Sequence, residues 1–421
     1  MFKRIFKLIR NPYVFSMIAQ IIGFVIAFLF TVFQARFLGA EIKGQIATIT
    51  SMTGITSIIF GFGISQAYPY YRKNSQKNVL PIFIRISLVM LIVYFIIALL
   101  TVLVLDLDKK YISVIFITPL MVYEFIISEI TLVEKPNKRN GINTIVNCAE
   151  LVLVIALWLF VKPTFLYGIM IVIFQHVVKT LVFTFWWRKT IFQKTDVTMA
   201  ELKSIIKFGF FPMLAMLMAT LNYRLDVLML DYHVSDATIG VYSIGVLLAD
   251  RMWLVPDALK GVMVSNITKG KDSSEVSYVL RICNTLCLVI VLGVILIGKQ
   301  FINFVFGAEY DGAYKITLIL LMGVFPMISY KVITAYNTVI GKQNVSFGIL
   351  SLSVILNIIS NYFLIPKYGI YGAGIASVVS YLICSVLFIA YFCKITNEKY
   401  SNMLLINKND ISKARLMFKK K

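Results

Sequence analysis

Charged residues are scarce in this sequence. They make up 14% of its 421 residues, and only 20 residues are acidic, whereas a soluble globular chain carries about 25% charged residues. Hydrophobic residues make up 59%, with a mean hydropathy of +0.85. They come in runs of about 20, the length that crosses the hydrocarbon core of a bilayer. These features exclude an ordinary soluble protein and predict an all-α polytopic membrane protein.

Metal-binding and nucleotide-binding patterns are also missing. The chain has two histidines and five cysteines, and the cysteines lie in or beside apolar runs without the spacing of a metal site or a disulfide framework. The segment Gly293–Lys299 has the spacing of a phosphate-binding loop, but Gln300 follows instead of serine or threonine. No loop is long enough for an extramembrane catalytic domain. We therefore expect neither ATP hydrolysis nor another enzymatic activity, and no cofactor.

The apolar runs predict twelve membrane spans in two lobes. We expect an interfacial helix at 1–12, an N-terminal six-helix lobe at 13–190, a linker at 191–207, a C-terminal six-helix lobe at 208–393 and a basic tail at 394–421. The predicted spans are 13–33, 45–67, 82–105, 111–132, 142–161, 164–185, 208–230, 237–259, 279–298, 314–339, 345–365 and 370–393.

The net charge of +21 sets the expected orientation. Most lysines and arginines fall in the segments that are cytoplasmic if both termini are cytoplasmic, which follows the positive-inside rule. The charge therefore predicts topology, and we expect no nucleic acid partner. Abundant lysine, isoleucine and asparagine favour a bacterial source, and hence the bacterial cytoplasmic membrane.

The two halves of the chain resemble each other weakly. "NPYVFSMIAQ" and "FGFFPMLAML" open comparable helices, and "LWLFVKPTFLYGIMIVI" is echoed by "NYFLIPKYGIYGAGIASVV". These segments recur after roughly 200 residues, which predicts two parallel repeats around a central cavity, a transporter arrangement.

Charged residues inside the spans are candidates for function, because a charge at bilayer depth is costly. Arg224 and Asp226 are two apart on one helix, so their side chains point in different directions and we do not expect them to pair. Asp226 shares a face with Asn222. The other intramembrane or boundary candidates are Arg36, Lys179, Arg251, Lys331, His176, Glu124, Glu129, Glu150, Asp250 and Asp257. Each could instead serve only to neutralise a neighbour, and Pro256 is expected to bend the span that carries Asp250.

Several segments resemble the bacterial polysaccharide flippases, which move O-antigen or capsule repeat units and belong to the exporter superfamily of multidrug extruders and lipid II flippases. They are "ARFLGAEIKGQIA", "RLDVLML", "ATIGVYSIGVLLADR", "FVFGAEYDGAYKI" and "LNIISNYFLIPKYGIYGAGIASVVSYL". The resemblance implies two six-helix lobes around a cationic cavity and alternating access. It implies an undecaprenyl-pyrophosphate-linked oligosaccharide as substrate, with membrane lipids and polysaccharide polymerase or assembly proteins as candidate partners.

The resemblance also suggests roles for these residues. Arg224 and Arg251, with Lys179, Lys331 and Arg36 as further candidates, would bind the pyrophosphate in the cavity. Related lipid II flippases hold sodium between their seventh, eleventh and twelfth helices, and the matching positions here are Asp226, Asn357, Asn361, the Ala373 carbonyl and Ser377. Asn361 replaces a second acid of that pattern. Sodium or a proton would couple transport, with Asp250 as a further candidate, although the asparagines could simply join helices by hydrogen bonds.

Two rival functions remain at this point. A multidrug extruder of the same superfamily would favour a cavity rich in acids and aromatics, whereas four bases lie inside these spans. A polysaccharide polymerase or glycosyltransferase would need a larger extramembrane loop than this chain offers.

Overall fold

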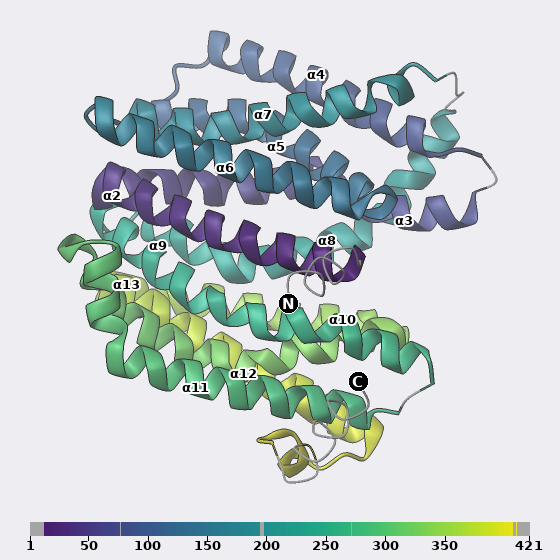
Figure 1. Cartoon of the computed structure of the whole chain (residues 1–421), viewed down its shortest axis with the longest axis vertical. Helices are drawn as coiled ribbons and strands as arrows, with labels where there is room; N and C mark the ends of the chain where they lie inside the picture. The colour runs from purple at the N-terminus through teal and green to yellow at the C-terminus, as the bar shows by residue number, and fades with distance from the viewer. Residues whose placement is uncertain (1–11, 76, 194–197, 271, 407–409, 411–421) are drawn as a thin grey trace, which may run out of the picture. The chain divides into compact units, whose positions relative to one another are not determined.

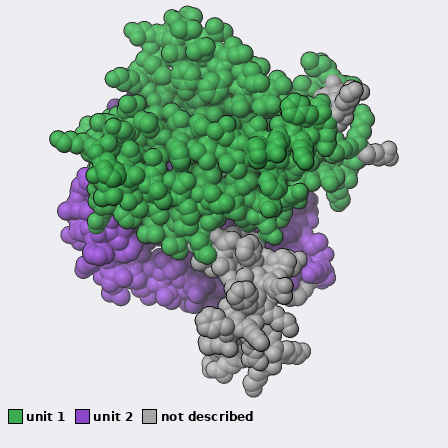
Figure 2. All heavy atoms as spheres, turned by 45° about the horizontal axis from the view of Figure 1, so that its top comes forward, with its two compact units in different colours: residues 1–220 green, residues 221–421 purple. Residues whose placement is uncertain are grey.

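The computed structural model describes residues 12–75, 77–193, 198–270, 272–406 and 410, with side chains from residue 22 onward. Within these ranges all regular structure is helical. The chain divides into two compact units, residues 1–220 and 221–421 (Figure 2), and the division falls inside one helix. The predicted interfacial helix at 1–12 lies almost entirely outside the described residues.

Ten of the described helices are long and apolar enough to cross a membrane. The chain is therefore an all-α, multi-pass membrane protein, as the composition predicts. Many of its largest apolar side chains are exposed, for example Leu103, Val104 and Phe160, which suits contact with lipid rather than water.

The described part of unit 1 contains seven helical segments, if the part of α8 before residue 221 is included, and Figure 1 labels them. They are α2 (Pro12–Phe60), α3 (Ile64–Asn74), α4 (Leu80–Val104), α5 (Lys109–Glu134), α6 (Pro136–Phe160), α7 (Phe165–Ile191) and α8 (Met199–Leu230).

Local signals in the sequence mark several of these helix starts. The Asp108 side chain accepts a hydrogen bond from the Lys110 N–H at the start of α5, and Pro136 occupies the first turn of α6, where its missing N–H costs nothing. At the start of α8, Thr198 and Glu201 exchange side-chain to backbone hydrogen bonds. This reciprocal pattern is a capping box. It begins α8 at Met199, so the last part of the linker predicted at 191–207 is helical.

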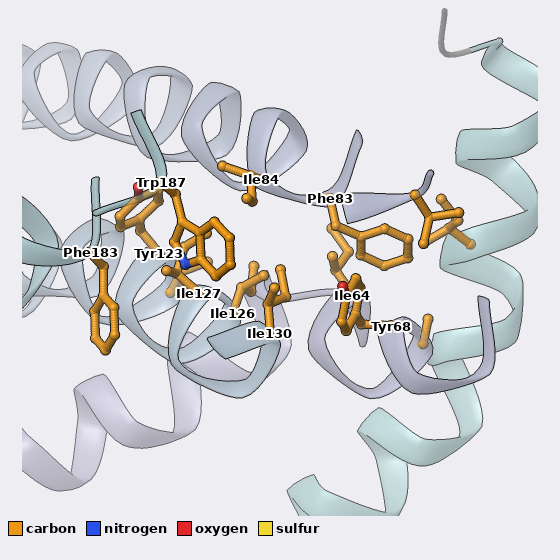
Figure 3. Close-up of a cluster of buried hydrophobic side chains, with 14 of the residues drawn as sticks. Ile64, Tyr68, Phe83, Ile84, Tyr123, Ile126, Ile127, Ile130, Phe183 and Trp187 are labelled. Atoms are coloured by element: carbon orange, nitrogen blue, oxygen red, sulfur yellow. The ribbon is translucent and has the colours of Figure 1, made fainter. Parts of the chain in front are cut away.

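Helix α5 is the centre of unit 1. It packs against α2, α3, α4, α6 and α7, and the side chains on its inner face join a large apolar cluster. Figure 3 shows Tyr123, Ile126, Ile127 and Ile130 of α5 beside Phe183 and Trp187 of α7. The Trp187 indole N–H donates to the Thr131 hydroxyl at 3.0 Å, so the buried polar atom of the largest side chain is satisfied.

The described part of unit 2 contains the end of α8 and eight further helical elements. These are α9 (Asp236–Asp250), η1 (Arg251–Trp253), α10 (Leu254–Thr268), α11 (Ser274–Val305), η2 (Ala308–Tyr310), α12 (Ala313–Val339), α13 (Gln343–Thr396) and η3 (Tyr400–Met403). Helix α12 has the central place, packing against α9, α10, α11 and α13. The short 3-10 turn η1 interrupts the predicted eighth span just before Pro256, which lies in the first turn of α10.

Two helices are too long to cross a bilayer once. At about 1.5 Å per residue, α2 with 49 residues and α13 with 54 residues are each more than twice as long as the hydrocarbon core. Each contains one glycine with non-helical backbone angles, Gly39 (φ 71°) and Gly369 (φ 54°). A positive φ is strained for residues other than glycine, so these two positions allow each long helix to break where the sequence predicts a loop.

Candidate functional site

The stretch of α8 that contains Arg224 and Asp226 has two different faces. Asn222 and Asp226 are buried, with 2% and 5% of their surface exposed, whereas Arg224 is exposed. No ion pair joins Arg224 to Asp226 within the described part of the chain. The spacing of two residues on a helix accounts for this separation.

Both oxygens of the Asp226 carboxylate are engaged by neutral donors. Oδ1 accepts a hydrogen bond from the Val227 backbone N–H at 2.8 Å, and Oδ2 accepts one from the Tyr242 hydroxyl of α9. Tyr242 is fully buried and also interacts with the Ser377 hydroxyl of α13. Asp226 is therefore connected through Tyr242 to α13.

Amide and hydroxyl groups of α13 form the second part of this site. The Asn361 amide donates to the Asn357 Oδ1 at 2.9 Å, and the Asn357 amide donates to the Ser380 hydroxyl at 3.3 Å and to the Ser377 hydroxyl at 3.5 Å. Asn357 and Asn361 are at most 1% exposed. Asn361 Oδ1 is buried and has no hydrogen-bond partner among the described residues.

These residues form an oxygen-rich cluster in unit 2, which we call the Asp226 cluster: Asp226, Tyr242, Asn357, Asn361 and Ser377. A buried amide oxygen without a partner is costly, and a cation would satisfy it. The available donors are a carboxylate, two amide oxygens and hydroxyl oxygens, with the buried Ala373 on the same helix as Ser377. Oxygen donors of this kind suit a hard cation such as sodium. The residues present therefore fit such an ion.

Three of the five predicted substrate-binding cations lie in unit 2 and share one acidic neighbour. Arg224, Arg251 and Lys331 all interact electrostatically with Asp250, whose Oδ1 also accepts a hydrogen bond from the Trp253 indole at 3.0 Å. Lys331 Nζ lies 3.5 Å from the Asp257 carboxylate and 5.4 Å from the Trp253 ring centre. The interruption at η1 places Arg251 at the junction between α9 and α10.

The other two predicted cations lie in unit 1. Lys179 of α7 is 8% exposed and forms an ion pair with Glu124 of α5 at 3.0 Å. Arg36 is an exposed residue of α2, three positions before the break at Gly39. Within unit 2, three of the five predicted residues thus act on the same acid, Asp250, while the other two belong to unit 1.

The sequence alone does not identify some of the residues that hold the Asp226 cluster together. Tyr242, Ser353, Ser380 and Tyr381 each contact Asn222, Asp226 or Asn357 from another helix or from a later turn. The spacing of Ser377, Ser380 and Tyr381 places all three on adjoining faces of one helix, and this is the only local signal. The contact of Tyr242 with Asp226 depends on how α8 and α9 pack, which no spacing reveals.

Curated relatives match only part of the chain. A stretch of 173 residues is 24% identical to the probable flippase AglR of Haloferax volcanii, covering 39% of this chain and 36% of that protein. A stretch of 190 residues is 22% identical to the probable low-salt glycan biosynthesis flippase Agl15 of the same organism, covering 42% and 39%. A third relative, an uncharacterized membrane protein of Methanocaldococcus jannaschii, is 32% identical over 105 residues, which cover 24% of this chain and 20% of that protein.

Solved structures match over nearly the whole length. The lipid II flippase MurJ in an inward closed conformation aligns with a TM-score of 0.73 at 18% identity, covering 97% of this chain and 93% of the other. An inward-facing multidrug resistance transporter of the MATE family aligns with a TM-score of 0.65 at 13% identity, covering 91% and 98%. At these identities the likeness shows the fold alone.

The family of this chain is shown by a match between its sequence and a known protein family. Residues 10–249, more than half of the chain, match the family described as polysaccharide biosynthesis protein. This range includes all of unit 1 from residue 10 and the α8–α9 part of the Asp226 cluster. The chain therefore belongs to the polysaccharide biosynthesis protein family.

Proposed function

We propose that this protein is a flippase that moves lipid-linked oligosaccharide across a membrane, and that it is a transporter rather than an enzyme. The observation that carries the proposal is that Arg224, Arg251 and Lys331 all act electrostatically on one acid, Asp250, inside a membrane-embedded unit. The family supports it, as do two relatives named as probable flippases and a fold shared with a lipid II flippase.

The basic residues would bind the phosphate groups that join lipid and sugar. Guanidinium groups can bind phosphate oxygens through two parallel hydrogen bonds, so Arg224 and Arg251 are the proposed diphosphate ligands. Lys331, Lys179 and Arg36 are proposed as weaker contributors. Lys331 and Lys179 already have acidic partners, Asp257 and Glu124, and each would have to exchange that partner for phosphate.

Ion coupling is proposed at the Asp226 cluster. Asp226, Asn357, Asn361 and Ser377, with the Ala373 carbonyl, would hold a sodium ion, and a proton on Asp226 is the alternative. When bound, the cation would neutralise the buried carboxylate. The unpartnered Asn361 Oδ1 supports this proposal, because a metal ion would replace its missing donor. Asp250 is a second candidate for ion coupling. Its protonation could change when substrate binds, since it interacts with three of the proposed phosphate ligands.

The finer details extend the same proposal. We infer twelve crossings, with α2 and α13 each crossing twice, two six-helix lobes around a central cavity, and both termini in the cytoplasm. The substrate would be undecaprenyl-pyrophosphate-linked repeat units for O-antigen or capsule in a bacterial inner membrane, passed to a polymerase or assembly protein. The matched curated relatives are archaeal. The bacterial source and the undecaprenyl carrier are therefore parts of the proposal, and the experiments on function test them as well.

A multidrug extruder is the second candidate, because the fold is also shared with MATE transporters. The three basic residues around Asp250 weigh against it, since an extruder of cationic drugs would expose acids without such neighbours. Resistance to cationic dyes conferred on a sensitive host would support this second function.

Deletion with complementation tests the proposal. We expect the deletion strain to lose its surface polysaccharide and to accumulate lipid-linked precursor, and the wild-type gene to restore both. Arg224→Ala should fail to restore them, whereas Arg224→Lys should restore them in part because it keeps the charge but loses bidentate binding. Surface polysaccharide that persists in the deletion strain without precursor accumulation would overturn the flippase assignment. Equal, full activity of both Arg224 variants would remove the phosphate role of this residue.

A further inference from the structure

A buried charged network joins two helices of unit 1, α5 and α7. The Glu124 carboxylate of α5 lies between two partners on α7: its Oε2 is 2.5 Å from His176 Nδ1 and its Oε1 is 3.0 Å from Lys179 Nζ. The three side chains are 10–14% exposed. His176 and Lys179 are three residues apart on α7 and so share a face.

Glu150 of α6 is a second acid beside this network. It is 2% exposed, and its Oε1 is buried without a hydrogen-bond partner in the described part of the chain. The charged groups that act on it are Lys179 of α7 and Glu124 of α5. Helix α2 also packs against α6; its titratable side chains from residue 22 onward are Arg36, Glu41 and Lys43, and none of them is among the groups that act on Glu150.

The charge balance of the four residues is incomplete. Glu124 already pairs with Lys179, so an ionised Glu150 would add an uncompensated negative charge to a low-dielectric interior. Burying such a charge costs several kcal/mol or more, and a group in this situation is neutralised instead. Neutrality of the four residues requires one more positive charge, and the unpartnered Oε1 of Glu150 is the atom that would bind it.

A proton fits this place better than a metal ion. The Lys179 ammonium beside Glu150 repels an entering metal cation, and no group of three histidine, cysteine or acidic side chains able to hold a metal occurs among the described residues. A proton needs only one oxygen and no coordination shell. The neighbouring His176 imidazole offers a second acceptor within the same network, so the proton can be held without moving a helix.

We propose that unit 1 contains a proton-binding site formed by Glu150 and the Glu124–His176–Lys179 network. One proton from water forms an O–H bond with Glu150 and makes the four residues neutral overall, and its release to water returns the negative charge. The site is separate from the Asp226 cluster of unit 2 and does not depend on what the protein carries. Under the proposed function it would give unit 1 its own response to a proton gradient.

Infrared spectroscopy of the purified full-length protein in lipid nanodiscs tests this site, because a protonated carboxylic acid has a carbonyl band distinct from that of a carboxylate. We expect the wild-type protein to show such a band within the range from about pH 5 to about pH 8, shifted in heavy water. Glu150→Gln should remove the component of this band that Glu150 contributes. Glu150→Asp should keep it, at a changed frequency, because the carboxyl group remains.

Glu129→Gln is the matched control. Glu129 is on α5 like Glu124, but it is 35% exposed and pairs with Arg139 at 3.1 Å, so its loss should leave the band unchanged. A carbonyl region that Glu150→Gln leaves unchanged, or the absence of such a band from the folded wild-type protein over the whole range, would overturn the proposal. Loss of that component in Glu150→Gln supports the site whether or not the protein proves to be a flippase.

Discussion

The buried carboxylates of the two units have different kinds of hydrogen-bond partner. In unit 1, Glu124 is held by a lysine and a histidine, and the positive charge it needs belongs to the protein. In unit 2, Asp226 is held by a tyrosine hydroxyl and a backbone N–H, and the groups linked to it through Tyr242 on α13 are amides and hydroxyls. Neutral donors orient a carboxylate without cancelling its charge.

This difference indicates different ligands. A site that already pairs its carboxylate with a lysine has room for a proton at most, whereas a carboxylate whose hydrogen-bond donors are all neutral can accept a metal cation, even with Arg224 and Asp250 acting on it electrostatically. The same chain would then carry a proton-binding site in unit 1 and a sodium-binding site in unit 2. Predictions that separate the two clusters are therefore the most informative.

The largest expected effect is the loss of the acid that organises unit 1. Glu124→Gln leaves the Lys179 ammonium and the His176 ring buried without their charged partner, and removing one member of a buried ion pair costs about 3–5 kcal/mol. We expect the variant to unfold at a markedly lower temperature in detergent than the wild-type protein.

The control for this prediction is again Glu129→Gln, which breaks a more exposed pair worth about 1 kcal/mol or less. If Glu124→Gln and Glu129→Gln were equally stable, the unit 1 network would be a solvated one, and the contrast between the two units would disappear.

Asp226→Asn should have a smaller effect on folding. The amide keeps the shape and one acceptor oxygen, but its NH₂ group faces a donor, either the Tyr242 hydroxyl or the Val227 N–H. A buried donor left unsatisfied costs about 1–3 kcal/mol. Thermal unfolding with and without sodium measures both consequences: we expect moderate destabilisation and no stabilisation by sodium. Undiminished stabilisation by sodium would exclude Asp226 as a ligand.

Asn361→Asp tests whether the Asp226 cluster of unit 2 binds a cation. The substitution puts a negative charge where a buried amide oxygen has no partner, so a cation at this cluster should bind more tightly. An additional attraction of about 1.4 kcal/mol corresponds to about tenfold in affinity. Isothermal titration with sodium measures the change, and potassium serves as the control. Unchanged or weaker sodium binding would indicate that Asn361 only joins neighbouring turns of its helix.

The smallest expected effect comes from Asp311, a partly exposed acid of unit 2 that belongs to neither buried cluster. Asp311 accepts a hydrogen bond from Asn303 at 2.9 Å and lies 3.5 Å from Lys299, and these contacts lower the pKa of its carboxyl. A lowered pKa gives stability that is present above the ordinary value, about 3.9, and is lost as pH falls through the folded value. Asp311→Asn should therefore be slightly less stable than the wild-type protein at neutral pH, with the difference vanishing in acid. A constant difference across the pH range would show that the charge has no part in it.

The sequence predicts the fold far better than it predicts the contacts. Runs of apolar residues locate the helices well, and the breaks at Gly39 and Gly369 fall in predicted loops, because bilayer thickness limits the length of a span. Helical spacing also separates Arg224 from Asp226. Spacing along one helix cannot find partners on another, however. Lys179 is a predicted substrate-binding residue, and its pair with Glu124, 55 positions earlier in the chain, is visible only in the structure.

The start of α8 shows that hydropathy alone does not locate a helix end. The polar segment before residue 208 reads as a linker by hydropathy, yet Thr198 and Glu201 form a capping box and the helix starts at Met199. Here a local hydrogen-bonding pattern overrides the hydropathy signal, and the pattern was available in the sequence.

The most direct test of the central claim is a translocation assay with the purified protein in proteoliposomes and a fluorescent lipid-diphosphate-linked oligosaccharide. The accessibility of the sugar to an externally added enzyme reports its movement between leaflets. The account predicts faster movement in proteoliposomes than in protein-free vesicles, nearly abolished by Arg224→Ala and dependent on a cation gradient. Equal rates with and without the protein, under both sodium and proton gradients, would contradict it.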